Sequence, residues 1–404
     1  MKCIVRSYGL GGGAPRSLLQ HIMVLKKTGY DNIICLTSEG DESLLTEYKN
    51  NVNYIIMRKS PAELWEEKKR LDAFREYEYE YSLLKKEMPQ LVIVLGEING
   101  ALYSYICKKL GIRLIIYIAG AELNTNEQVI ELWENCNVIC FSEENADTIC
   151  KHYSPEHTFI IPNRIAINYH FSDLRTHYQN KCSIVKILIV SRLTDSKIKS
   201  VYSLLNLLKE VAGEHNLIKV RIAGSGNKEK ELSAYCQGII SPYLKITLLG
   251  HVDALCEQFK WAHIVAGKGR SVIEPIIMNR VGCIIGEDGR ICFCSLDSFD
   301  LLYHYNFSGR GIVNDDPLFE IQDAIKRIRN GEILESDIIE VSSIVEKHYS
   351  AIYLPEKLKT VLDNLPELEY KKQGVFLPYQ FIRFLMKKIE GKVVNKWIHM
   401  NLSN

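Results

Sequence analysis

Two short segments carry side chains that could hold a phosphorylated ligand. The first supplies two cations, Arg192 and Lys197, directly after the apolar run 186–190. A guanidinium and an ammonium suit a diphosphate leaving group, because they offset the charge that develops as it departs. The second segment, 269–274, combines a glycine turn with a carboxylate after another apolar run. We therefore expect both segments at the carboxyl ends of buried strands, where open α/β sheets bind ligands.

The residues of the second segment have different expected roles. Gly269, Arg270 and Ser271 lead into a predicted helix, whose first N–H groups would face a phosphate. Glu274, one turn further, could accept hydrogen bonds from two ribose hydroxyls. Each feature also has a purely structural alternative. Glu274 could be a capping acid near the helix start, and the two cations could be an ordinary surface pair.

Two more glycine turns follow predicted strands in the same half of the chain. Gly224 comes directly after the predicted strand residues 220–223, and Gly250 follows 245–248, with Val252 just beyond it. A glycine at a strand end lets the backbone approach a ligand closely, although it can also serve only as a tight turn. We expect all three residues to line a donor-binding site.

A glycine cluster also opens the chain. Residues 8–14 include Gly12 and Gly13 between a predicted strand and a predicted helix, so they can present backbone N–H groups to a phosphate. The same loop matches the G-x-G-x-x-A dinucleotide pattern, with Glu39 as a candidate ribose partner. A nicotinamide-dependent oxidoreductase is therefore kept as an alternative.

The apolar runs that precede these turns alternate with helical patterns, which is typical of parallel, doubly wound α/β sheets. A polar stretch at 169–181 separates two such series, and we place the domain boundary at about 170–181. We expect an α/β fold of two Rossmann-like domains, residues 1–170 and 182–355, facing across a cleft that would hold the binding site. Strands are predicted at 2–7, 32–37, 52–57, 91–95, 114–118, 138–142, 158–162, 186–190, 219–223, 245–248, 264–266 and 282–285.

The composition describes a soluble globular protein. Of 404 residues, 47% are hydrophobic, and 50 basic residues balance 49 acidic ones. We therefore expect no positive electrostatic potential over the whole surface that would attract nucleic acid. The 12 cysteines are scattered without a C-x-x-C pair, which favours reduced thiols in the cytoplasm. No signal peptide or membrane-spanning run is evident.

Two charged segments stand apart from the alternation. Residues 62–87, with alternating Glu and Tyr at 76–81, are interpreted as a solvated surface helix. The tail 371–404 carries seven Lys or Arg and one acid, interleaved with large apolar residues. This pattern fits either a helix packed on the domains or a membrane-surface helix, which would place the protein on the inner face of the plasma membrane.

The order of these motifs resembles the retaining nucleotide-sugar glycosyltransferases of glycosyltransferase family 4, which have the GT-B fold. The resemblance covers most of the chain to about residue 350. Its ordered set consists of Gly11-Gly12-Gly13 with Arg16, Phe141-Ser142-Glu143, Ile161-Pro162-Asn163-Arg164-Ile165, Ser191-Arg192-Leu193 with Lys197, Ala223-Gly224-Ser225-Gly226, Leu249-Gly250 and the segment 269–274.

The resemblance implies an activity and a set of roles. The enzyme would transfer a sugar, with retention of configuration, from a nucleotide-diphosphate donor to a glycan or lipid-linked glycan. It would need no metal and no cofactor. Arg192 and Lys197 would hold the diphosphate and Glu274 the ribose. The remaining donor contacts would come from backbone groups around Gly12, Gly13 and Ser271 for the phosphates, and from Gly250 and Val252 for the base.

The chain also departs from the family pattern. Ala266 stands where an E-x(7)-E motif expects its first glutamate, and Ala119 stands where many members have a histidine. Glu122, just beyond Ala119, is a candidate for contact with the acceptor or sugar, with a structural carboxylate as its alternative. Arg164 replaces a usual glycine. These departures keep a second hypothesis open: a non-catalytic GT-B-like subunit that binds a nucleotide or a partner enzyme.

Overall fold

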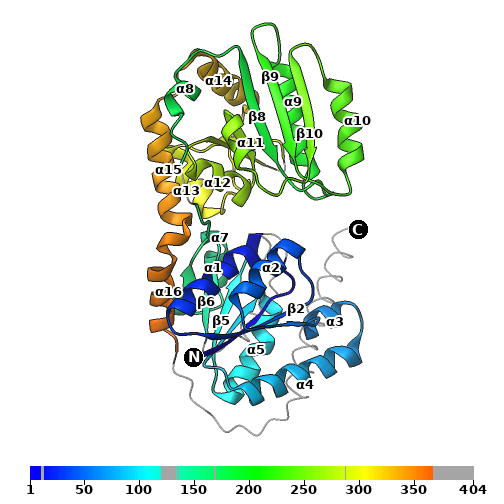
Figure 1. Cartoon of the computed structure of the whole chain (residues 1–404), viewed down its shortest axis with the longest axis vertical. Helices are drawn as coiled ribbons and strands as arrows, with labels where there is room; N and C mark the ends of the chain where they lie inside the picture. Colours follow the sequence, from blue (N-terminus) through cyan, green and yellow to red (C-terminus); the bar gives the residue numbers. More distant parts are fainter. Residues whose placement is uncertain (11–12, 120–132, 134–135, 168–169, 287, 367–404) are drawn as a thin grey trace, which may run out of the picture. The chain divides into compact units, whose positions relative to one another are not determined.

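The computed structural model describes residues 1–10, 13–119, 133, 136–167, 170–286 and 288–366 (Figure 1). The chain divides into two compact units. The first consists of Met1–Arg164 together with the chain from Leu354 onward, and the second is Ile165–Tyr353. Each unit is built around one predominantly parallel sheet.

The first unit alternates strands and helices along most of its length. Its strands are β1 (Lys2–Arg6), β2 (Asn32–Thr37), β3 (Tyr54–Met57), β4 (Leu91–Leu95), β5 (Arg113–Ile118), β6 (Asn137–Cys140) and β7 (Thr158–Ile160). Its described helices are α1 (Gly13–Lys27), α2 (Glu42–Asn51), α3 (Pro61–Glu66), α4 (Arg70–Glu87), α5 (Glu97–Leu110), α7 (Glu143–Ile149), the 3₁₀ turn η1 (Pro155–His157) and α16 (Leu354–Asp363).

The first sheet is parallel and has the order β3-β2-β1-β4-β5-β6-β7. Every residue of β4 is buried, because helices cover both faces of the sheet. Such strands read as continuous apolar runs rather than as alternating patterns. This explains why the predicted strands 32–37 and 91–95 coincide with β2 and β4.

Helix α16 returns from the far end of the described chain to complete the first unit. Leu354 and Leu358 are fully buried against the same face as α1. The amide of Asn137, in β6, donates to the Val361 carbonyl at 2.8 Å. The core of the first unit therefore depends on residues about 200 positions downstream of its last strand.

The second unit repeats the alternation. Its strands are β8 (Ile184–Val190), β9 (Leu217–Ala223), β10 (Leu244–Gly250), β11 (Ile264–Gly267), β12 (Val281–Ile285) and β13 (Ile291–Phe293). Its helices are α8 (Leu174–Tyr178), α9 (Ile198–Val211), α10 (Glu229–Ile239), α11 (Cys256–Trp261), α12 (Arg270–Ile277), α13 (Leu296–His304), α14 (Pro317–Asn330), α15 (Glu335–Tyr349) and the 3₁₀ turn η2 (Ala351–Tyr353).

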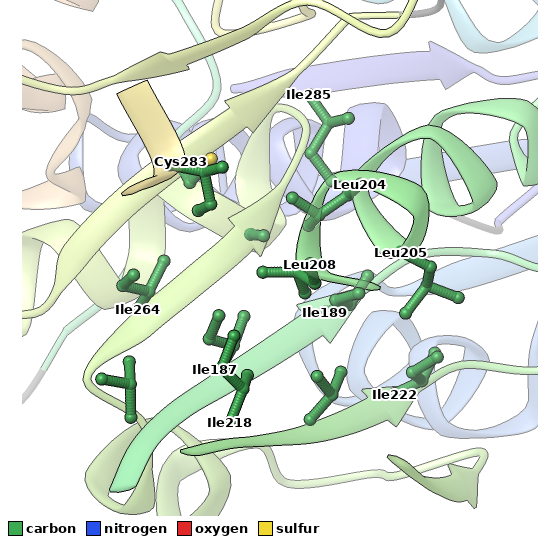
Figure 2. Packing of buried hydrophobic residues seen from close by; sticks show 14 of the residues in the cluster. Ile187, Ile189, Leu204, Leu205, Leu208, Ile218, Ile222, Ile264, Cys283 and Ile285 are labelled. Atoms are coloured by element: carbon green, nitrogen blue, oxygen red, sulfur yellow. The ribbon is translucent and has the colours of Figure 1, made fainter. Parts of the chain in front are cut away.

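The second sheet has the order β10-β9-β8-β11-β12-β13, parallel except for the antiparallel edge strand β13. Helix α8 lies in the polar stretch expected between the domains, yet it belongs to this unit. The Tyr178 hydroxyl is buried and donates to the His263 carbonyl at 2.6 Å. Figure 2 shows part of the core of this unit, where Leu204, Leu205 and Leu208 of α9 pack against strand isoleucines; Tyr178 belongs to the same cluster.

The segment 62–87 corrects one expectation. It forms two helices, α3 and α4, and its glutamates are not all solvated. Glu76 and Glu80 are buried, because Arg58 binds Glu76 (Nε to Oε1, 2.7 Å) and Arg6 pairs with Glu80 (Nε to Oε1, 3.1 Å). Charged groups leave water only when they are paired in this way. Helical spacing places both glutamates on the same side of α4.

The cationic tail 371–404 lies outside the described residues. None of the helices in the described ranges is both long and apolar enough to span a bilayer.

Candidate functional site

The segment that carries Arg192 and Lys197 and the segment 269–274 lie at the same edge of the second sheet. Strand β8 has β9 on one side and β11 on the other, so the chain order reverses there. Parallel pairing places Val190 opposite Gly267. Ser191 and Arg192 therefore leave the sheet beside the turn that precedes α12. Such a switch point, at the carboxyl ends of the strands, is where open α/β sheets bind ligands.

The two cations occupy the loop between β8 and α9. Arg192 is exposed, and its guanidinium forms no hydrogen bond or ion pair within the described part of the chain. Lys197 is half-buried at the N-cap of α9, and its backbone N–H donates to the Thr194 carbonyl at 2.9 Å. The loop thus presents one guanidinium to solvent and holds one ammonium at the start of a helix.

Backbone contacts brace this loop against the next one. Leu193 N–H donates to the Ser225 carbonyl at 3.0 Å, and the Asn227 amide donates to Asp195 at 2.7 Å. Lys228 adds an ion pair to Asp195 at 3.3 Å. The hydrogen bonds from Asn227 and Lys228 lower the pKa of Asp195. The cation-bearing loop is therefore held by its neighbour.

Gly224 has a structural role in this bracing. It has a φ of +148°, and a Cβ atom there would overlap the Ser191 carbonyl oxygen. Its N–H donates to the Gly250 carbonyl at 2.8 Å. Gly250, at φ +67°, ends β10 with an irregular register. The glycines at 224 and 250 thus permit three strand ends to pack closely together.

The remaining predicted base-binding residue follows Gly250. Val252 is half-buried and packs with Phe171, Leu249 and their neighbours on the face of the sheet that carries Leu188. Its backbone therefore lies next to the strand ends, while its side chain joins a local apolar cluster.

The turn before α12 is formed by residues that the sequence singles out. Gly269, at φ +57°, donates its N–H to the Phe307 carbonyl at 2.6 Å. The Ser271 hydroxyl accepts from Lys268 N–H at 3.2 Å and donates to the Lys268 carbonyl at 3.0 Å. These contacts fix the helix start, whose first N–H groups lack partners within the helix and can bind an anion.

Glu274 is not a capping acid. It lies one turn into α12, half-buried, where Arg270 pairs with it at 3.6 Å (Nε to Oε2). A carboxylate accepts about four hydrogen bonds, so this pair leaves acceptor capacity for ligand hydroxyls. Arg270 and Glu274 together form a charged rim beside the glycine turn.

In the first unit, Gly13 begins α1, and a Cβ atom there would meet no atom within 4 Å. Steric crowding therefore does not require glycine at this position, which leaves close approach of a ligand as an explanation. Two predicted site residues, Gly12 and Glu122, lie outside the described residues.

The first unit contains a candidate that the sequence reasoning missed. Strand β1 has β2 and β4 on its two sides, so its switch point lies between β1 and β4. Glu97 follows β4 at the start of α5, and burial raises the pKa of its carboxyl to about 7. Gly96, at φ +95°, packs against the Tyr8 ring and turns the chain there. A carboxylate directly after a buried strand was the signal that could have identified it.

Among the described residues, no group of three or more His, Cys, Asp or Glu side chains could hold a metal ion.

Several solved structures resemble the chain across most of its length. HepE from Anabaena, in complex with UDP-glucose, has a TM-score of 0.61 at 13% identity, covering 90% of this chain and 100% of HepE. The lipopolysaccharide outer core galactosyltransferase WaaB has a TM-score of 0.61 at 15% identity, covering 90% of this chain and 99% of WaaB. A putative UDP-N-acetylglucosamine 2-epimerase from Listeria monocytogenes has a TM-score of 0.57 at 11% identity, covering 90% and 96%.

No protein-family model matches the chain, and no curated protein matches its sequence. At these identities, the structural likeness establishes the fold: the chain has the GT-B fold, with two parallel-rich α/β sheets. The activity has to be argued from the residues at the strand ends.

Proposed function

We propose that this protein is a glycosyltransferase that uses a nucleoside-diphosphate sugar as donor. The observation that carries the proposal is the pairing of β8 with β11, with Val190 opposite Gly267. It brings the Arg192 loop beside the glycine turn of α12 at the switch point of the second sheet. A cationic loop and a helix start at one edge suit a diphosphate.

Each group has a role in this proposal. Arg192 and Lys197 bind the diphosphate and stabilise the charge that grows on it as the bond to the sugar breaks. The first N–H groups of α12, near Ser271, hold a phosphate oxygen. Glu274 accepts hydrogen bonds from the ribose through the acceptor capacity that Arg270 leaves.

The reaction proceeds with retention and without a metal in this proposal, as in glycosyltransferase family 4, and the acceptor is a glycan or a lipid-linked glycan. The first unit supplies the acceptor side. Glu97 is the described carboxyl best placed there, since it stands at the switch point of the first sheet.

The similar structures support the nucleotide-sugar part of the proposal. HepE was captured with UDP-glucose, and WaaB is named a galactosyltransferase, whereas the Listeria protein is named a UDP-sugar epimerase. A UDP-sugar is named for HepE and for the Listeria protein, whereas a transferase activity is named for WaaB. Product analysis must therefore accompany any binding measurement.

The test compares Arg192→Ala with Arg327→Ala. Arg327 is an exposed arginine near the end of α14, a part of the helix that contacts the chain before the amino end of β8 rather than the carboxyl ends, so it is a matched control. Isothermal titration with UDP and UDP-glucose should show at least about tenfold weaker binding for Arg192→Ala, equal to about 1.4 kcal/mol. Arg327→Ala should bind like the unaltered protein.

A transfer assay with glycan acceptors follows the titration. Sugar transfer that declines in Arg192→Ala and persists in Arg327→Ala is the expected result. Equal binding and equal turnover in both variants would contradict the proposed donor site. Tight binding of nucleotide sugars without any transferred or hydrolysed product would instead favour a non-catalytic subunit.

A further inference from the structure

Three lysines stand side by side on one face of the second sheet. Lys186 in β8 is paired in register with Lys219 in β9, which in turn is paired with Lys245 in β10. Neighbouring strands lie about 4.8 Å apart, so the row spans roughly 10 Å. Like charges in directly opposite positions destabilise a sheet. Such a row calls for an explanation.

Protection of the sheet edge explains only one of the three. Lysines on an edge strand discourage pairing with other chains, and Lys245 lies on the edge strand β10. Lys186 and Lys219 lie on inner strands, where this role does not apply. The alternate residues of these strands, such as Ile187 and Val220, face the core beneath α9.

Nearby acidic groups do not neutralise the row. In the described ranges, no carboxylate forms an ion pair with any of the three lysines. Asp173, on an adjoining segment, is held by Arg280 at 2.9 Å. On the β11 side, His263 accepts from Lys186 N–H through Nδ1 at 3.1 Å, and burial lowers the pKa of its ring to about 3. The positive charge of the row is therefore uncompensated.

Two lysines of the row, Lys219 and Lys245, line a cavity of about 270 Å³. Arg221 adds a fourth cation, with its guanidinium 4.0 Å from the centre of the Trp261 ring and donating to Gln258 Oε1 at 2.9 Å. Helix α11 supplies both of these partners. The cavity is lined by Lys219, Val220, Arg221, Lys245, Thr247 and Trp261.

We propose that this cavity binds an acidic saccharide. Lys219, Lys245 and Arg221 would hold its carboxylate or phosphate groups, and Trp261 would form an apolar wall beside the sugar ring. At about 270 Å³ the cavity lies just below the usual volume of ligand pockets, so it fits one sugar unit with its acidic group, whereas a membrane is flat. The requirement for negative charge comes from the three cations that line the cavity, Lys219, Arg221 and Lys245. The choice of a saccharide rests on the proposed function, because a glycosyltransferase handles glycans.

The cavity is separate from the donor site. The lysines lie near the amino ends of their strands, whereas Arg192 and Gly269 follow carboxyl ends. Lys219 lies four positions before Ala223, the last residue of β9, which corresponds to roughly 13 Å, and Arg221 lies between them, two positions before that strand end. A ligand in the cavity could therefore be bound together with the nucleotide sugar.

Isothermal titration of the full chain with trigalacturonate, with and without saturating UDP, tests the proposal. The double variant Lys219→Gln/Lys245→Gln should weaken binding at least about tenfold. The control Lys209→Gln/Lys230→Gln removes the same charge from exposed positions on α9 and α10 and should change binding less than about twofold. Neutral maltotriose should not bind, and added salt should weaken trigalacturonate binding.

Several outcomes would overturn the proposal: no binding of trigalacturonate, equal weakening in both double variants, or displacement of trigalacturonate by UDP. If tripolyphosphate bound as tightly as trigalacturonate, the site would recognise only negative charge, and the proposal that its ligand is a saccharide would be refuted. A chain that binds trigalacturonate but no nucleotide would refute the proposed function and leave this site standing. All four lysines are exposed, so neither variant should unfold at a lower temperature, and removal of the opposed lysines Lys219 and Lys245 should raise the unfolding temperature slightly.

Discussion

Gly224 lies so close to Ser191 that a Cβ atom at position 224 would stand 1.8 Å from the Ser191 carbonyl oxygen. The backbone conformation, with φ at +148°, is also one that side-chain-bearing residues rarely adopt. The loop that presents Arg192 thus rests directly on the backbone of the next loop. Its position depends on the absence of a single methyl group.

Gly224→Ala should therefore damage both stability and the donor site. We expect the free energy of unfolding of the second unit to fall by about 2–4 kcal/mol, because the new methyl group must displace backbone atoms. UDP binding should weaken as the Arg192 loop moves. Denaturant unfolding and isothermal titration measure the two effects.

Gly238→Ala is the matched control for this substitution. Gly238 lies within α10, and a Cβ atom there would meet nothing within 4 Å. Alanine in a helix should raise the free energy of unfolding by about 0.5–1 kcal/mol. If the two variants were equally stable, the contact between Gly224 and Ser191 would not have the importance assigned to it.

Glu97 should make the first unit less stable as the pH rises. Burial raises its pKa from 4.5 to about 7, so between these values the folded state keeps a proton that the unfolded state has released. Its contribution is complete below pH 4.5 and is lost as the pH rises through 7. Because the side chain is half-buried, we expect about 1 kcal/mol after solvent screening.

Glu97→Gln mimics the protonated acid and should remove the part of the pH dependence that Glu97 contributes, while Glu80, whose pKa burial also raises to about 7, keeps its own part. Thermal unfolding between pH 4.5 and 8.5 should show the variant above the unaltered protein at high pH and level with it at low pH. Exposed Glu47 on α2 provides the control, as Glu47→Gln should leave the profile unchanged. A Glu97→Gln profile parallel to the unaltered one would argue against a buried carboxyl at this position.

Leu358→Ala should destabilise the first unit selectively. Leu358 is fully buried where α16 packs beside α1, so its truncation should cost about 2–5 kcal/mol. Hydrogen exchange should accelerate in β1 and α1 more than in β8 and α9. Lys359→Ala, at an exposed position one residue away, should change exchange little. Uniform acceleration through both units would show that they do not unfold separately.

Most strands were predictable because parallel strands that are buried on both faces have sequences of consecutive apolar residues. The edge strand β13 was not, since only Ile291, Cys292 and Phe293 form it and no such run marks it. The burial of Glu76 and Glu80 could not be predicted from the sequence either. Their partners, Arg58 and Arg6, precede α4 in the chain by many residues, and only the fold brings them together.

The site was predictable to a similar extent. Carboxyl ends of parallel strands share one edge, so Arg192 and Gly269 could be expected near each other from the order of elements alone. The role of Gly224 could not, because packing between two loops leaves no periodic signal. The pairing of Arg270 with Glu274 does follow from helical spacing, once the helix start is known.

The return of α16 also constrains how the protein is made. A ribosome releases the chain from its amino end, and domains generally fold as they emerge. All described strands of the first unit are available by Ile160, yet the Asn137 amide must wait for its hydrogen-bond partner, the Val361 carbonyl. Throughout this interval an apolar face of the newborn first unit lacks its cover, while the complete second unit can already form. The nascent chain should therefore depend on chaperones until α16 has left the exit tunnel of the ribosome.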